Sequence, residues 1–221
     1  MAAASNNTHP SYGEAALLVA ISFGWFIFAS VLAVVKGFPS STSSFSDSAL
    51  LSLMGVELVF GTLALAFLHR CGYALRDLLP APSWRGCLEG VLLCMAAALV
   101  CNVVWMLVPN SYRHDAVQPI AQMLANGKPT LVVAFAVAVL NGLYEETFLL
   151  GYLTRGFAAL GASFAVGLGV LVRLLYHLYQ GPNGALSIVV YGIVLGAVYW
   201  RTGRLWPAVF AHSLTDVLAL S

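Results

Sequence analysis

Charged residues are scarce in this sequence, because Lys, Arg, Asp and Glu together make up only 9% of its 221 residues. A typical soluble domain carries about 25% charged residues, so this chain has too few to cover a water-exposed surface. Hydrophobic residues make up 60% of the chain, and the mean hydropathy is +0.87. The composition therefore predicts an integral membrane protein that is in contact with the lipid bilayer.

Basic runs and paired cysteines are also missing. The formal net charge is only +1, and no cluster of Lys and Arg could neutralise nucleic-acid phosphates, so no nucleic-acid partner is expected. The four cysteines form no CxxC pair, which argues against a zinc ribbon or a thioredoxin-type centre. No Lys or Arg precedes the first apolar run, so a cleaved signal peptide is not expected.

Long apolar runs are abundant, and about 20 such residues suffice to cross a bilayer core as a helix. The predicted fold class is all-α, a polytopic transmembrane helical bundle of about seven spans (six to eight). The predicted spans are residues 15–35, 49–68, 86–108, 130–157, 163–179, 185–200 and 205–220. The mildly amphipathic stretch 115–127 predicts an additional interfacial helix. Residues 1–221 are expected to form a single membrane domain, in which 1–108 supply three N-terminal spanning helices.

The distribution of basic residues predicts the orientation. With the N-terminus in the cytoplasm, the inside loops hold six arginines and the outside loops three basic residues. The six are Arg70, Arg76, Arg85, Arg155, Arg201 and Arg204, and the three are Lys36, Arg113 and Lys128. The positive-inside rule therefore favours a cytoplasmic N-terminus and an outside C-terminus. The expected location is a multi-pass position in the cell's inner or plasma membrane.

Ionisable residues inside the predicted spans gather in the C-terminal half of the chain. They are Glu145, Glu146, Arg173, His177, His212 and Asp216. Each intramembrane charge costs about 2.5–3.5 kcal/mol on insertion scales, so such residues are functional by default. Two pairs are spaced i and i+4 and share a helix face, whereas the two adjacent glutamates diverge by about 100°. The pattern predicts a polar site between three helices.

This set of groups suits peptide hydrolysis. A carboxylate in a dry site can act as a general base toward water. An imidazole from another helix can donate a hydrogen bond to the developing oxyanion, and an acidic partner can orient that ring. The alternative is that the buried ionisable groups only hold helices together. For the isolated Glu57 of the second span, helix packing is the preferred interpretation.

Three short motifs resemble those of the CAAX protease and bacteriocin-processing family, the intramembrane proteases also called the Abi family. The sequence EETFLLG at 145–151 is similar to the family's EExxxR followed by Gly. The sequence RLLYH at 173–177 is similar to its FxxxH, and HSLTD at 212–216 fits its HxxxN/D. The resemblance covers about residues 115–220, which it identifies as a catalytic core. Each motif is weak alone, but their order and spacing together are highly specific.

The resemblance implies an intramembrane endopeptidase that cleaves a peptide or a membrane-associated protein. By carry-over from the motifs, Glu145 activates the water with help from Glu146, and His177 shares the water site. His212 with Asp216 would then stabilise the oxyanion. No cofactor is expected. A divalent metal such as zinc stays open as an alternative, and its ligands would be Glu145, His177 and His212.

Two positions depart from the family pattern. Leu150 stands where the family usually has arginine, and Arg173 stands where it has phenylalanine. We therefore expect Arg173 to replace the missing guanidinium and to neutralise Glu146 from the opposite helix. Two alternatives to a protease remain at this point. One is a catalytically inactive scaffold or bacteriocin-immunity factor, and the other is a small transporter that uses the same groups as a proton relay.

Overall fold

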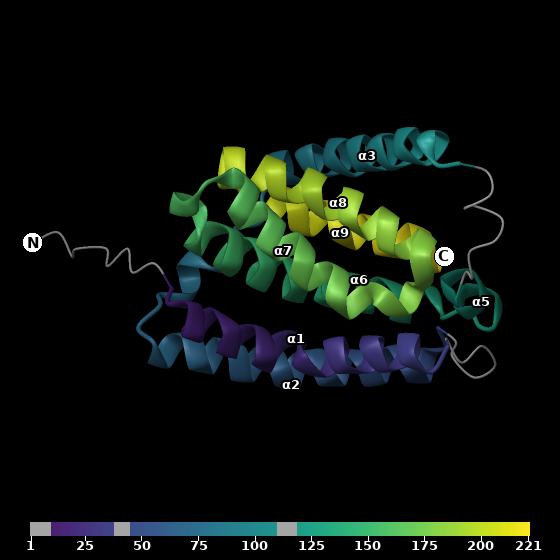
Figure 1. Ribbon diagram of the computed structural model, residues 1–221, viewed down its shortest axis with the longest axis horizontal. Helices are drawn as coiled ribbons and strands as arrows, with labels where there is room; N and C mark the ends of the chain where they lie inside the picture. The colour runs from purple at the N-terminus through teal and green to yellow at the C-terminus, as the bar shows by residue number, and fades with distance from the viewer. Residues whose placement is uncertain (1–9, 38–44, 110–118) are drawn as a thin grey trace, which may run out of the picture.

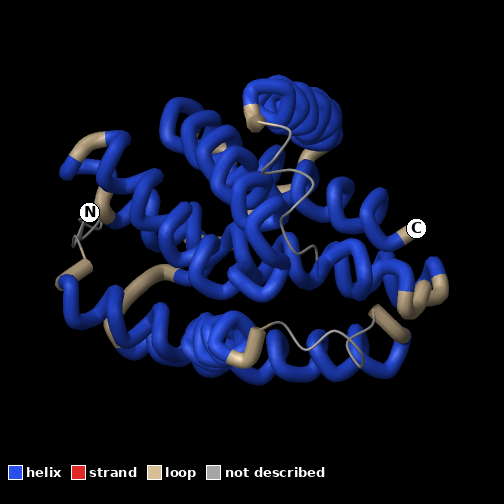
Figure 2. The backbone as a smooth tube through the Cα atoms, turned by 45° about the vertical axis from the view of Figure 1, so that its right-hand side comes forward, coloured by secondary structure: helices blue, strands red, loops and turns tan. Residues whose placement is uncertain are grey.

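Our computed structural model describes residues 10–37, 45–109 and 119–221. Within these ranges all regular structure is helical (Figure 2). The seven main helices correspond to the seven predicted spans. They are α1 (Tyr12–Val35), α2 (Asp47–Arg70), α3 (Trp84–Leu107), α6 (Leu131–Glu146) with its extension η2 (Thr147–Thr154), α7 (Ala162–His177), α8 (Gly181–Thr202) and α9 (Leu205–Leu220). The predicted all-α bundle is confirmed.

Serine side chains define where the first three long helices begin. Ser11, Ser46 and Ser83 each accept a hydrogen bond from the backbone N–H three residues further on. Such N-caps satisfy a donor that the first helical turn leaves unpaired. Glycines make the tight turns between the later helices, because Gly161, between η2 and α7, and Gly203, between α8 and α9, have φ of 93° and 64°.

Five helical stretches of the described residues are long and apolar enough to cross a membrane. The fifth, Ala162–Thr202, contains both α7 and α8. These two helices fold back on each other at η4 (Leu178–Gln180) and lie side by side in Figure 1. A Cβ atom at Gly192 would lie 3.2 Å from Val170, and one at Gly196 would lie 2.7 Å from Val166. The GxxxG spacing thus serves close packing of an antiparallel pair, and α9 is a shorter apolar helix.

The helices form three layers in Figure 1. Helices α6, α7, α8 and α9 lie in the middle, with α1 and α2 on one side and α3 on the other. Large apolar side chains are exposed on the outer helices, as a lipid-facing surface requires. Examples are Trp25, Phe28, Leu58, Leu92, Met95 and Leu99. Two apolar clusters form the core, one around Phe23, Phe148 and Tyr176 and the other around Cys94, Leu195 and Val209.

The arginine-rich loops meet at one end of the bundle. A cavity of about 720 Å³ there is lined by residues of the α2–α3 loop, the η2–α7 loop and the α8–α9 turn, including Arg155 and Arg204. These loops belong to the group predicted to lie inside the cell. The grouping agrees with the positive-inside argument, and the orientation itself stays a prediction. Of the predicted interfacial helix 115–127, residues 115–118 lie outside the described residues, and Pro119–Ala125 forms α5.

Candidate active site

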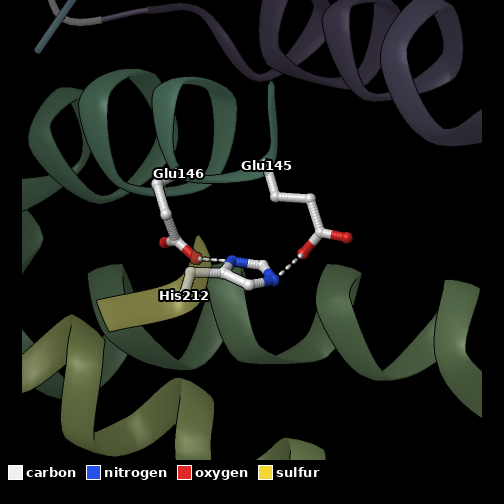
Figure 3. Close-up of side chains that lie close together, drawn as sticks. All are labelled: Glu145, Glu146 and His212. Carbon is white, nitrogen blue, oxygen red and sulfur yellow. Dashed lines mark hydrogen bonds and ion pairs between the residues drawn. The ribbon is translucent and has the colours of Figure 1, made fainter. Parts of the chain in front are cut away.

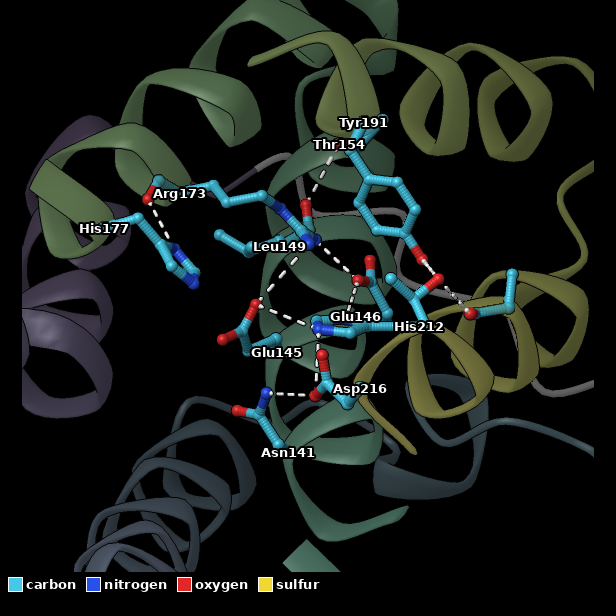
Figure 4. A network of polar contacts seen from close by, with 12 residues as sticks. Asn141, Glu145, Glu146, Leu149, Thr154, Arg173, His177, Tyr191, His212 and Asp216 are labelled. Atoms are coloured by element: carbon cyan, nitrogen blue, oxygen red, sulfur yellow. Dashed lines mark hydrogen bonds and ion pairs between the residues drawn. The ribbon is translucent and has the colours of Figure 1, made fainter. Parts of the chain in front are cut away.

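The six ionisable residues singled out by sequence come from three neighbouring helices of the middle layer (Figure 4). Glu145 and Glu146 end α6, Arg173 and His177 lie in the last two turns of α7, and His212 and Asp216 lie on α9. All but one are buried, with Glu146 at 0% and His177 at 9% relative exposure. The side chain of Asp216 is 26% exposed. The prediction that the three helices bring these groups together is therefore correct, and the cluster opens most at Asp216.

One oxygen of Glu146 is the centre of the network. Oε1 accepts a hydrogen bond from Arg173 Nη2 at 2.6 Å and lies 2.6 Å from Nδ1 of His212. Figure 3 shows the imidazole of His212 lying between the two glutamates. A carboxylate oxygen only accepts hydrogen bonds, so Nδ1 of His212 carries the hydrogen in this contact. Through Oε1, Glu146 therefore orients His212.

Glu145 is held more loosely. Its Oε2 lies 3.4 Å from Arg173 Nη1 and 3.8 Å from His212 Nε2. This oxygen is buried and has no hydrogen-bond partner. Separations of this size are longer than those of direct hydrogen bonds. The Oε2 atom of Glu145 is therefore free to bind a further polar group. Oε2 of Glu146 is also buried without a hydrogen-bond partner, but it belongs to a carboxylate that Arg173 and His212 already hold at 2.6 Å.

The far side of the His212 ring faces Asp216. Nε2 lies 3.6 Å from Asp216 Oδ2, and that oxygen accepts a hydrogen bond of 2.8 Å from Nδ2 of Asn141. The imidazole edge therefore points into a gap between two carboxylates that it does not directly bond. The ring of Tyr191 packs edge-on against His212 at a centroid distance of 6.0 Å, which further restricts the ring's orientation.

His177 lies beside this network and not inside it. Its Nδ1 is 3.0 Å from the carbonyl oxygen of Arg173, which can only accept. The neutral ring consequently keeps its lone pair on Nε2. The ring points toward the space next to Glu145 in Figure 4. Neither ion pairs nor hydrogen bonds join His177 to the glutamates in the described structure, so its predicted share in the water site stays a prediction.

Glycine allows α6 and α9 to approach closely enough for these contacts. A Cβ atom at Gly142, one turn before Glu146, would lie 2.5 Å from Ser213 Oγ and 3.1 Å from the carbonyl oxygen of Val209. On the opposite side, a Cβ atom at Gly192 would lie 3.4 Å from Cδ of Arg173. Small residues on α6 and α8 thus bring the polar side chains of α7 and α9 to the same point.

A π-helical segment begins directly after Glu146. Sequence analysis predicts a regular α-helix to residue 157, whereas residues Thr147–Thr154 form the wider helix η2. The hydroxyl of Thr154 donates to the carbonyl oxygen of Leu149, five residues earlier, at 3.0 Å. Gly151 gives room for the carbonyl oxygen of Leu78, which a Cβ atom would approach to 2.9 Å. Short π-helical segments inside α-helices frequently mark functional sites.

A metal ion fits this site poorly. The described residues contain one group of three donors within 4.8 Å of one another, namely Glu145, Glu146 and His212. His177, one of the three ligands of the metal alternative, is not in that group. The guanidinium of Arg173 already contacts both carboxylates and would repel a divalent cation between them. The expectation of a site without a metal ion stays a prediction, and the position of Arg173 favours it.

Sequence analysis missed two positioning residues. Asn141 and Tyr191 hold Asp216 and His212, as described above. Asn141 was recognisable, because it is an amide four residues before Glu145 in an apolar span and so shares its helix face. Glu57 was recognised but assigned to helix packing. Its carboxyl is buried at 3% exposure and interacts electrostatically with Glu145, Asp216 and His212.

Comparison with known proteins identifies one match. Residues 127–218 match the family described as Type II CAAX prenyl endopeptidase Rce1-like. The resemblance to CAAX proteases noted from the sequence is thereby confirmed, and the matched segment contains all five predicted catalytic residues. Neither the curated proteins nor the solved structures contain a match to this chain.

Proposed function

We propose, from the premise that residues 127–218 are a segment of the CAAX protease family, that this chain is a glutamate-dependent intramembrane endopeptidase. At the family level the match supports a peptide hydrolase embedded in the membrane. The finer proposal is that Glu145 activates a water molecule that attacks a peptide bond of a membrane-associated protein or peptide. The observation that carries it is the buried, unpartnered Oε2 of Glu145, 3.8 Å from His212 Nε2.

In the proposed reaction, a water molecule donates a hydrogen bond to Glu145 Oε2. Glu145 takes that proton as the water oxygen adds to the carbonyl carbon of the substrate, which creates a tetrahedral oxyanion. The proton then passes to the amide nitrogen, the C–N bond breaks, and a carboxylic acid and an amine leave. Glu145 returns to its starting form, so it acts first as a base and then as an acid.

His212 is the proposed oxyanion donor. Its Nδ1–H is held by Glu146, so when the ring carries both protons its Nε2–H points into the gap beside Glu145 and Asp216. Donors fixed before the reaction are worth roughly 2.7–4 kcal/mol each toward a developing oxyanion. Glu146, Arg173 and Asp216 fix the position and charge of this ring, and the Nε2 lone pair of His177 helps to orient the water.

Cleavage of a membrane-tethered peptide library by the purified protein tests the proposal. Glu145→Gln should abolish cleavage while the protein still folds and binds substrate, because the amide cannot accept the proton. A matched control is Glu89→Gln, which changes a glutamate of α3 whose side chain is 32% exposed and paired with Arg204. Cleavage that persists at the wild-type rate in Glu145→Gln would refute the assigned base.

The departures from the family motif favour one alternative, a catalytically inactive scaffold or immunity factor. Leu150 stands in η2 where the family usually has an arginine, so one guanidinium of the family motif is missing. Arg173 stands where the family has phenylalanine, and its guanidinium contacts both glutamates. A scaffold would cleave no peptide as wild type, and its cellular phenotype would survive Glu145→Gln. The transporter alternative predicts proton-coupled flux in liposomes, which a protease would not produce.

A further inference from the structure

A fourth carboxyl group faces the candidate site from outside the family-matched segment. Glu57 lies in the middle of α2, is 3% exposed, and has a buried Oε2 without a hydrogen-bond partner. Helix packing, the interpretation preferred from the sequence, gives no reason for a carboxyl at this position, because an apolar side chain would pack as well without the cost of burying a polar group.

The register of α2 against α6 places Glu57 at the level of the site. The backbone N–H of Thr130 donates to Asp47 Oδ1 at 2.7 Å near the start of both helices. Further along, a Cβ atom at Gly61 would lie 3.3 Å from the ring of Tyr144. Both pairs are 83 residues apart, so the helices run parallel with a constant offset. Glu57 consequently lies beside the turn that contains Asn141, one turn from Glu145.

Electrostatic interactions agree with this placement. Glu57 interacts with the charges of Glu145, Asp216 and His212. The phenol of Tyr179 interacts electrostatically with Glu145, Asp216 and Glu57. Tyr179 follows α7 and stacks on His177 at a centroid distance of 6.0 Å. Glu57 is therefore close enough to Glu145, Asp216 and His212 for its carboxyl to interact with their charges.

The guanidinium of Arg173 and the imidazole of His212 already contact carboxylates other than that of Glu57. Arg173 and His212 both contact Glu146 at 2.6 Å and Glu145 at 3.4 and 3.8 Å, respectively. In the ranges that the structure describes, no ion pair includes Glu57. A buried carboxyl group without a cation favours its neutral form. A basic group brought by the substrate would favour the ionised form and pair with it.

We infer that Glu57 is a specificity-determining residue that binds a cationic group of the substrate, a Lys or Arg side chain or a free amino group, next to the scissile bond. The inference rests on the proposed function and adds the substrate class to it. Helix α2, which the family match does not cover, thereby acquires a role, because it supplies the residue that selects the substrate.

Paired peptides test this inference. Each pair is identical except that one member carries lysine and the other the isosteric, uncharged norleucine, at each position near the cleaved bond in turn. The wild-type protein should have a higher kcat/KM for lysine at one position. Glu57→Gln should lower the lysine-to-norleucine ratio of kcat/KM about tenfold or more, the size expected for a hydrogen bond to a charged group. Glu89→Gln should leave that ratio as in the wild type.

Three results would overturn the inference. The first is a wild-type protein that cleaves lysine and norleucine peptides equally well. The second is a Glu57→Gln variant that keeps the preference for lysine. The third is a Glu57→Gln variant in which cleavage of the lysine peptide and cleavage of the norleucine peptide fall by the same factor. Binding of the same peptides to the Glu145→Gln protein provides an arm that needs no catalysis. The wild type could cleave no peptide and still bind the lysine peptide in preference to the norleucine peptide. If the double variant Glu57→Gln/Glu145→Gln then loses that binding preference, the proposed function fails and the binding role of Glu57 stands. Equal binding of both peptides overturns the role of Glu57.

Discussion

Replacement of Arg173 by methionine should destabilise the bundle strongly. The guanidinium is 2% exposed and contacts Glu146 at 2.6 Å and Glu145 at 3.4 Å. Methionine keeps much of the volume but leaves two buried carboxylates with His212 as their remaining charged neighbour. Removal of one partner from a buried ion pair typically costs about 3–5 kcal/mol. For a chain of this length, that loss corresponds to a fall in melting temperature of roughly 10 °C.

Thermal unfolding in one detergent, at fixed pH and protein concentration, measures this change. The decisive comparison is the double variant Arg173→Met/Glu146→Gln, which should be more stable than Arg173→Met alone because the unpaired carboxylate is gone. Recovery should be incomplete, since Glu145 also loses its contact. The control is Arg204→Met, which breaks an ion pair with Glu89 whose side chains are 40% and 32% exposed. Exposed pairs contribute about 0–1 kcal/mol, so this variant should melt close to the wild type.

Two outcomes would refute the reasoning. If the Arg173→Met protein has the same melting temperature as the wild type, the guanidinium does not neutralise the glutamates. A double variant no more stable than Arg173→Met would mean that the loss comes from packing and not from charge. Either result would also remove the explanation offered for the departure of Arg173 from the family motif.

Three further predictions follow from the same geometry. Gly142→Ala should lower peptidase activity at least tenfold and destabilise the protein by about 1–3 kcal/mol, since its Cβ would force α6 and α9 apart. The control is Gly167→Ala, because a Cβ at that position meets nothing within 4 Å. Equal melting temperatures and cleavage rates for the two variants would contradict the close-packing argument. Activity should stay within twofold of its starting value in excess chelator, because Arg173 lies where a metal would bind; a loss that zinc restores would show the opposite. With the N-terminus inside, an impermeant maleimide should label exposed Cys71 only after permeabilisation but label Ser221→Cys in intact cells, and the reverse pattern would invert the orientation.

The two glutamates of the candidate site are almost completely buried. Glu145 and Glu146 are 4% and 0% exposed, and the most accessible group of the cluster is Asp216. Asp216 lies toward the C-terminal end of α9, at the end of the bundle that carries η4 and not the arginine-rich loops. Asp216 therefore marks the side on which the cluster of described residues is most open.

The sequence by itself determined the membrane environment, the helical class and six ionisable residues of the candidate site. Apolar length and scarcity of charge dictate helices in lipid, because the bilayer offers backbone groups no other hydrogen-bond partners. The cost of intramembrane charge singled out Glu145, Glu146, Arg173, His177, His212 and Asp216, and the i, i+4 spacing put them on helix faces.

Only the tertiary structure decided which of these groups meet, because side-chain contacts between helices depend on register and on close approach at positions such as Gly142 and Gly192. In the folded protein Glu146 contacts both Arg173 and His212, and Oε2 of Glu145 has no hydrogen-bond partner. His177 contacts the carbonyl oxygen of Arg173 and neither glutamate. The tertiary structure also brought Glu57 to the site from a helix more than 80 residues away in the chain. No local pattern contains that placement, since it arises from the parallel packing of α2 on α6.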